Sequence, residues 1–220
     1  MALNSSLRNT LFFNRGHRKF DVQLGWNELQ NRVVITTGFE ARNQQEQFLQ
    51  LRWNMNRSWT FKTRFRNLNQ TNDSQNFDNR DFDISLWEGE PSLTWQTNNS
   101  LRTIVSFKRR DAQNDLANEQ LSSNEFKLEG TYNFSYKKQK HPTALRLGLT
   151  LADVDFDGVA NTPAGFVLLQ GLRDGRNFLW NLNLDRQLVN NMRLSINYEG
   201  RKTGASRIVH IGRVQVAAVF

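Results

Sequence analysis

The chain has 220 residues, no cysteine and three prolines, which excludes a disulfide-stapled secreted module and a proline-rich linker protein. Apolar residues make up 38% and aromatic residues 11%, while the mean hydropathy is -0.66. A polar average with many large aromatics is typical of a membrane barrel, which is apolar outside and polar in its lumen. The formal net charge of +8 is spread along the chain, so we assign it to a charged lumen or loop surface and expect no nucleic-acid partner.

No apolar run reaches the roughly 18 residues that a transmembrane helix needs. The first residues lack a charged segment followed by an apolar run, so we expect any export leader to lie outside this sequence. Alternation of apolar and polar residues with a period of two dominates the chain and predicts strands throughout. The clearest alternating segments are 20–26, 33–40, 49–53, 59–66, 126–136, 145–151, 178–184, 192–198 and 214–220.

The connections between these segments alternate between short and long, as in outer-membrane barrels with short periplasmic turns and long outer loops. We treat 81–96 as one strand with a bulge around 89–91, and 166–172 as part of an outer loop. The sequence therefore predicts one all-β domain over 1–220, an antiparallel transmembrane β-barrel of about 12 strands (10–14 in range) with both termini periplasmic. The short connections are 54–58, 97–100, 138–142 and 188–191, and the long ones are 67–80, 109–124 and 153–177.

Large aromatic side chains gather near the ends of the predicted strands, where the girdle of a membrane barrel belongs. A soluble β protein with the same aromatics in its core stays open as an alternative. The chain ends on a patterned strand that closes with phenylalanine, which resembles the terminal signal that barrel-assembly machinery recognises. We therefore expect outer-membrane lipid and that machinery as partners. The predicted girdle consists of Trp26, Trp53, Trp59, Trp95, Trp180, Tyr198 and Phe220.

The final quarter carries the segments GLRDGRN at 171–177 with Trp180, YEGR at 198–201 and VHIGRVQV at 209–216. These segments resemble the C-terminal β-barrel region of large outer-membrane proteins of the Bacteroidota. The resemblance implies a fold and a location in a Gram-negative outer membrane, and it implies no activity. It also implies that a barrel of this kind is either the C-terminal part of a longer protein or a separate subunit.

Charged side chains alternate with the apolar ones and are therefore expected on the inner face of the barrel. Paired charges there avoid the cost of isolated burial, whereas an arginine-lined pore favours anions. A salt-bridged, non-conducting interior and a selective channel both stay open. The predicted lumen charges are Arg52, Lys62, Arg64, Arg66, Arg102, Arg146, Arg193, Glu40, Glu129 and Asp185.

Three alternating carboxylates, Asp153, Asp155 and Asp157, match the opening of a calcium loop. Asn161 is a further oxygen donor, but Ala164 stands where an EF-hand has its bidentate glutamate. A complete EF-hand is excluded, and the choice lies between a simpler Ca²⁺ site and an ordinary acidic outer loop. We expect no other cofactor.

The three histidines are His17, His141 and His210. A barrel-borne surface hydrolase would need a nucleophile held by a histidine, and Ser206 shares a strand face with His210. His17 could approach them if the first and last strands close the barrel. Apart from this arrangement the sequence carries no signature of an enzyme.

The leading hypothesis is a non-enzymatic outer-membrane barrel that serves as an anchor, scaffold or subunit of an assembly or transport complex. Its outer loops are then available to other outer-membrane or periplasmic proteins. The alternatives are a porin-like channel that prefers anions and, third, the surface hydrolase.

Overall fold

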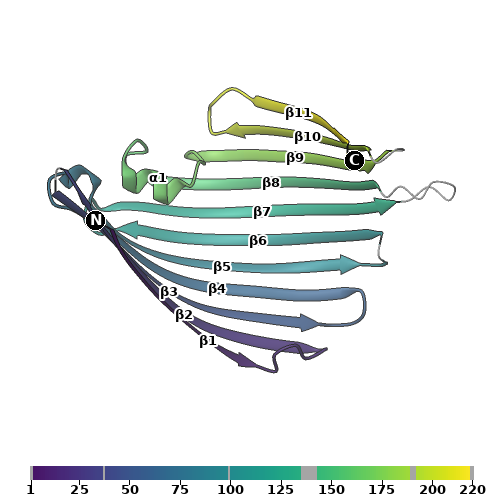
Figure 1. Cartoon of the computed structure of the whole chain (residues 1–220), viewed down its shortest axis with the longest axis horizontal. Coiled ribbons are helices and arrows are strands. Elements are labelled where there is room, and N and C mark those ends of the chain that lie inside the picture. Colours follow the sequence, from purple (N-terminus) through teal and green to yellow (C-terminus); the bar gives the residue numbers. More distant parts are fainter. Residues whose placement is uncertain (1, 37, 99, 135–142, 189–191, 219–220) are drawn as a thin grey trace.

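A computed structural model describes residues 2–36, 38–98, 100–134, 143–188 and 192–218. It contains a single antiparallel sheet of eleven strands, each paired with the next along the chain (Figure 1). A short helix, α1 (Pro163–Leu169), and a 3₁₀ turn, η1 (Asp78–Arg80), lie in connections. The all-β antiparallel class expected from the sequence is confirmed. The strands are β1 (Ala2–Phe13), β2 (Phe20–Ile35), β3 (Gly38–Asn54), β4 (Trp59–Ser74), β5 (Phe82–Gln96), β6 (Leu101–Asn114), β7 (Glu119–Phe134), β8 (Thr143–Asp157), β9 (Gly175–Gln187), β10 (Met192–Thr203) and β11 (Val209–Ala218).

In the central part of the sheet the register keeps the alternating apolar positions of neighbouring strands on one face. Leu128 of β7 lies opposite Val105 of β6 and Leu149 of β8, and Leu149 lies opposite Trp180 of β9. Because side chains alternate along a strand, the positions in between form the second face. We call the face with Leu128 the outward face. The other, with Arg66 and Glu88, is the inner face.

The connections lie alternately at two ends of the sheet, the turn end and the loop end. Of those that lie within the described residues, 14–19 and 55–58 are at the turn end, and 75–81, 115–118, 158–174 and 204–208 are at the loop end. The longest of them, 158–174, is at the loop end, whereas the short connections expected at 138–142 and 188–191 lie wholly or mostly outside the described residues. With eleven antiparallel strands, β1 begins at the loop end and β11 ends at the turn end. The prediction that both termini lie on one side is therefore wrong, because it required an even number of strands.

Two predicted strands at the start of the chain are placed differently in the structure. β2 runs without a break from Phe20 to Ile35, and the segment 33–40 contains the β2–β3 turn instead of forming a strand. The reason is that Glu28, Gln30 and Arg32 occupy the outward face of β2, so the hydrophobic alternation disappears while the hydrogen-bonded ladder continues. The count becomes eleven, within the predicted range.

The same effect shortens the loops expected at 67–80, 109–124 and 153–177. β4 continues to Ser74, β6 and β7 leave only 115–118 as a turn, and β8 reaches Asp157. These segments are rich in Asn, Asp and Gln, which are poor strand formers by propensity, but pairing with neighbouring strands overrides that preference. The strands therefore project beyond the apolar part of the sheet.

β5 is the single long strand that was expected, but the predicted bulge is absent. Gly89 pairs with Arg109 and Ser92 pairs with Ser106, so the register is the same on both sides of Pro91. Proline lacks an N–H and cannot donate to the ladder. Here it interrupts the hydrogen bonding with β6 without inserting an extra residue.

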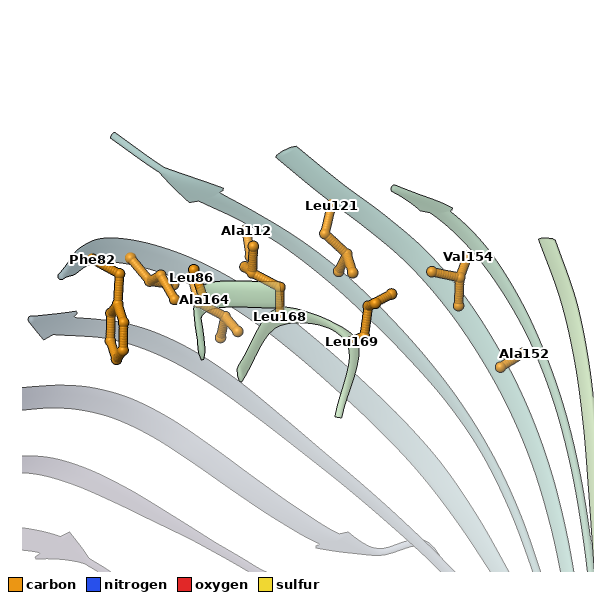
Figure 2. Packing of buried hydrophobic residues seen from close by; sticks show 10 residues of the cluster. Phe82, Leu86, Ala112, Leu121, Ala152, Val154, Ala164, Leu168 and Leu169 are labelled. Atoms are coloured by element: carbon orange, nitrogen blue, oxygen red, sulfur yellow. The ribbon is translucent and has the colours of Figure 1, made fainter. Parts of the chain in front are cut away.

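The main apolar core of the described residues lies where α1 packs against the inner face at the loop end. Figure 2 shows Leu168 and Leu169 of α1 among Leu86, Ala112 and Leu121 from β5, β6 and β7. Thr162 caps the helix by accepting a hydrogen bond from the Gly165 N–H at 2.9 Å. Segment 166–172 thus belongs to a loop, as expected, but folds inward. Neither helix in the described ranges is long and apolar enough to cross a membrane.

Candidate functional site

The outward face carries a continuous apolar band across the sheet. On each of β7 and β8 the band spans seven to nine residues, close to the roughly 9–11 residues of a tilted transmembrane β-strand. Many of its side chains are exposed, including Leu24, Trp53 and Phe126. Its members on β2 to β10 are Phe20, Val22, Leu24, Trp26, Leu49, Leu51, Trp53, Trp59, Phe61, Phe65, Trp87, Leu93, Trp95, Leu101, Val105, Phe107, Phe126, Leu128, Tyr132, Phe134, Leu145, Leu147, Leu149, Leu151, Phe178, Trp180, Leu182, Leu184, Met192, Leu194, Ile196 and Tyr198.

Six of the seven predicted girdle residues lie on this outward face, and Phe220 lies outside the described residues. Trp59 and Trp95 are register partners at the turn end, with ring centroids 6.0 Å apart. Trp26 does not flank a turn as predicted, because it lies inside β2 at the opposite margin of the band. Trp87 lies at that same margin, and sequence reasoning missed it because the expected bulge obscured its alternation.

Trp180 and Tyr198 form a small aromatic cluster near the last strand. The Trp180 ring lies over Gly200, where an added Cβ would come within 2.1 Å of the ring. Tyr198 and the His210 Nδ1 atom are 2.8 Å apart in a hydrogen bond. The aromatic ring fills the space that glycine leaves open, which stabilises the β9–β10–β11 edge.

All ten predicted lumen charges lie on the inner face, and most of them form ion pairs. Direct register partners join Arg52 to Asp21 and Arg66 to Glu88, the latter at 3.1 Å. Arg146 contacts Asp185 at 3.4 Å between β8 and β9. The further pairs are Arg64–Glu46 at 2.8 Å, Lys108–Glu125 at 3.0 Å, Glu129–Lys127 at 3.0 Å and Glu40–Arg42 at 3.2 Å.

The acidic halves of several pairs were missing from the sequence-based set. Glu46 lies in a polar run between the segments 33–40 and 49–53, and Glu88 lies beside the expected bulge. Their signal was present: Glu46 lies three residues before segment 49–53 and Glu88 lies within 81–96, each in phase with the polar positions of its strand. Cross-strand pairs of opposite charge contribute roughly 0.2–1 kcal/mol each. The set of ion pairs, which we call the salt-bridged lattice, therefore stabilises the inner face.

Three basic residues of the predicted set lack an ion-pair partner among the described residues. Lys62, Arg102 and Arg193 are exposed on the inner face toward the turn end. Lys62 is the register partner of Arg52, which places two cations side by side. This end of the inner face therefore carries an excess of positive charge.

Toward the loop end, buried polar residues form hydrogen bonds to both ends of the loop that carries α1. Asn114 donates a hydrogen bond to Glu119 at 2.9 Å, and Glu119 accepts another from the Val159 N–H at 3.1 Å. At the end of the same loop, Asn177 is fully buried and bonds the backbone N–H and C=O of Arg173. Hydrogen bonds therefore hold both ends of loop 158–174, and α1 covers part of the inner face.

The predicted calcium ligands do not converge. Asp153, Asp155 and Asp157 follow one another along the outward face of β8 beyond the apolar band, roughly 7 Å apart along the strand. A loop was expected here, but the strand continues to Asp157 because it pairs with β7. The described part of the chain holds no group of three or more His, Cys, Asp or Glu residues placed to bind a metal.

The residues considered for a hydrolase are also kept apart. His17 lies in the β1–β2 connection at the turn end and packs against Phe20, whereas His210 is near the loop end of β11. The Ser206 hydroxyl is engaged with Thr203 in the β10–β11 turn. His141 lies outside the described residues.

A comparison with protein-family models gave no match, and a comparison with curated proteins gave none either. Solved structures of outer-membrane β-barrels do match. The siderophore receptor PirA of Acinetobacter baumannii superposes with a TM-score of 0.64 at 10% identity, over 97% of this chain and 38% of that one. CdiB of the same organism gives 0.63 at 13% identity, over 100% and 45%.

The ferric enterobactin receptor PfeA of Pseudomonas aeruginosa gives a TM-score of 0.62 at 11% identity, over 98% of this chain and 39% of that one. Identities this low establish the fold alone. The chain therefore has the fold of an outer-membrane barrel wall and spans about two fifths of the length of these structures.

Proposed function

We propose that this chain is a non-enzymatic part of an outer-membrane β-barrel that serves as an anchor, scaffold or subunit of an assembly or transport complex. The observation that carries the proposal is the sheet's division into an apolar outward band and an ion-paired inner face. The number of residues that the band spans along each strand is close to that of a transmembrane β-strand. A soluble protein rarely exposes so many large apolar side chains in one stripe.

The proposed location is the outer membrane of a Gram-negative bacterium, with lipid covering the band and the loop end directed outward. The aromatic residues at the margins of the band would then lie at the lipid headgroups. The resemblance to large Bacteroidota proteins and a role for barrel-assembly machinery at the last strand belong to the same proposal. Other outer-membrane or periplasmic proteins would bind the projecting strands or the turns.

The test is a matched pair of arginine substitutions on the outward face of β7. Leu128 lies in the middle of the band, while Gln120 lies on the same face eight residues nearer the loop end. In a membrane, Leu128→Arg should cost about 2–4 kcal/mol and Gln120→Arg about 0–1 kcal/mol. The measurement is the folded fraction in native membranes, read by electrophoresis of unboiled samples against urea concentration. Equal effects of the two substitutions would overturn the membrane proposal.

A second candidate function is an anion-preferring channel, which the unpaired Lys62, Arg102 and Arg193 favour. Against it stand the salt-bridged lattice and the loop that folds over the inner face. Planar-bilayer conductance separates the two. A steady anion-selective current that weakens in Lys62→Glu would support the channel, and an absence of current from folded protein would support the scaffold.

A further inference from the structure

Both margins of the sheet are unpaired strand edges. In the described ranges β1 pairs only with β2, and β11 pairs only with β10; Figure 1 shows them at opposite margins. Leu11 of β1 is 73% exposed and Val214 of β11 is 68% exposed. Neither strand contains the proline or lysine that usually protects a free edge. In hydrocarbon, each unpaired backbone N–H or C=O costs several kcal/mol, so both edges require partners.

The direction of the strands limits what those partners can be. Because eleven antiparallel strands lie between the two margins, β1 and β11 run in the same direction. Direct closure of β1 on β11 would create a parallel seam, and two copies facing each other would create two. An odd number of additional antiparallel strands joins both edges with the pairing that the rest of the sheet already uses.

The curvature of the sheet also fits a larger barrel. Nearly the whole chain superposes on 38–45% of the three larger barrel chains, with TM-scores of 0.62–0.64. The eleven strands thus adopt the shape of a sector of such a wall. The rest of such a wall would be supplied by other strands.

The charged residues on the inner face of β1 and β11 indicate which side chains a partner strand would carry. Ion pairs cross the strand boundaries β2–β3, β3–β4, β4–β5, β6–β7 and β8–β9. Each free edge carries one arginine on its inner face, Arg8 on β1 and Arg213 on β11. Neither arginine has an ion-pair partner within the described part of the chain. At those five boundaries the basic side chain meets a carboxylate of the neighbouring strand, and the same arrangement at the edges places a carboxylate opposite Arg8 and Arg213.

We infer that β1 and β11 are the two seams at which another β segment completes the barrel. That segment has an odd number of antiparallel strands, alternates apolar and polar residues, and faces Arg8 and Arg213 with Asp or Glu. This inference rests on the proposed function, since only a membrane barrel needs both edges closed.

The test is photo-crosslinking in the outer membranes of cells that make the protein, with the captured peptides identified by mass spectrometry. A photoreactive amino acid is placed at inner-face positions of the edges, where it faces away from lipid: Ser6 or Thr10 on β1, and Gln215 or Ile211 on β11. We expect each edge to capture residues outside 2–218. Moving the probe from Ser6 to Thr10 should shift the captured residue to a lower number, as antiparallel pairing requires.

Several outcomes would overturn the inference. A β1–β11 peptide within one copy means self-closure, and the same peptide between two copies means a dimer. A captured residue whose number rises along with the probe's means a parallel seam. Capture at neither edge means that the edges are free. A probe at Gln50, in the middle of β3, is the positive control and should capture only β2 or β4.

A further probe at Leu128 separates failure of this inference from failure of the proposed function. Lipid adducts at Leu128 show that the wall is in a bilayer whatever the edges capture, and their absence would reject the membrane role itself. In Arg213→Glu, capture at Gln215 should fall about fivefold, the upper range for a partly exposed ion pair. Unchanged capture in that variant would reject the predicted carboxylate.

Discussion

Replacing Leu168 with alanine tests whether apolar packing holds loop 158–174 over the inner face. Leu168 is 1% exposed and lies in the cluster formed by α1 with β5 to β8, whereas Phe166 of the same helix is 66% exposed. Burial of a leucine side chain contributes about 2–3 kcal/mol, and a residual cavity adds to the loss. If the loop opens locally, a loss of about 2–3 kcal/mol raises its open population roughly 30- to 150-fold.

The measurement is hydrogen exchange of the α1 amides in the folded, membrane-embedded protein, with limited proteolysis of the loop as a second readout. Leu168→Ala should accelerate exchange in 163–169 and leave the central strands unchanged. Phe166→Ala removes a larger side chain from the same helix and should have little effect, because that ring is mostly in solvent. Equal acceleration in the two variants would refute the packing explanation.

Three more perturbations test other contacts. Gly200→Ala pushes a Cβ into the ring of Trp180 and should destabilise the fold by about 1–3 kcal/mol, measured by urea titration. Gly130 has open space around it, so Gly130→Ala should cost about 1 kcal/mol or less in the same assay. Asn177→Ala removes two hydrogen bonds to the Arg173 backbone, so proteolysis of 158–174 should accelerate by the equivalent of about 1–3 kcal/mol; an unchanged rate would contradict this. A double-mutant cycle on Lys108 and Glu125 should give a coupling of about 0.2–1 kcal/mol, and zero coupling would remove that pair from the lattice.

The sequence was sufficient to predict the fold class and the shared face of the ten charged residues assigned to the lumen, because both follow from alternation with a period of two. Assigning Leu128, Leu147 and Arg66 to a face of the sheet required only the phase of the alternation, and that phase does not change when a turn is misplaced. The ion-pair partners could not be identified from the phase alone, because Glu46 and Glu88 lie outside or beside the hydrophobic segments that define it.

The ends of the strands and the position of α1 could not be predicted from the alternation of apolar and polar residues. Beyond the band, β4 and β6 are mostly polar on both faces, with Leu68 and Ala112 as exceptions, so the pattern that marks a strand ends before the ladder does. The inward fold of α1 depends on an apolar patch assembled from Ile84, Ala112 and Val154, three strands whose spatial order only the sheet establishes. The loop expected around Asp153, Asp155 and Asp157 is wrong for the first reason, because β8 continues through these residues.

The extension of the ladder past the apolar band determines what the cell surface would present. From Phe107 to Asn114, β6 continues for seven residues beyond its last apolar outward side chain, a rise of roughly 20 Å. A peptide epitope inserted into the turn 115–118 would therefore stand clear of the lipid headgroups on a stiff extension of the sheet, in which β5 and β8 flank the β6–β7 hairpin. An antibody would reach it without the chain having to unfold, so this turn is a natural place for display.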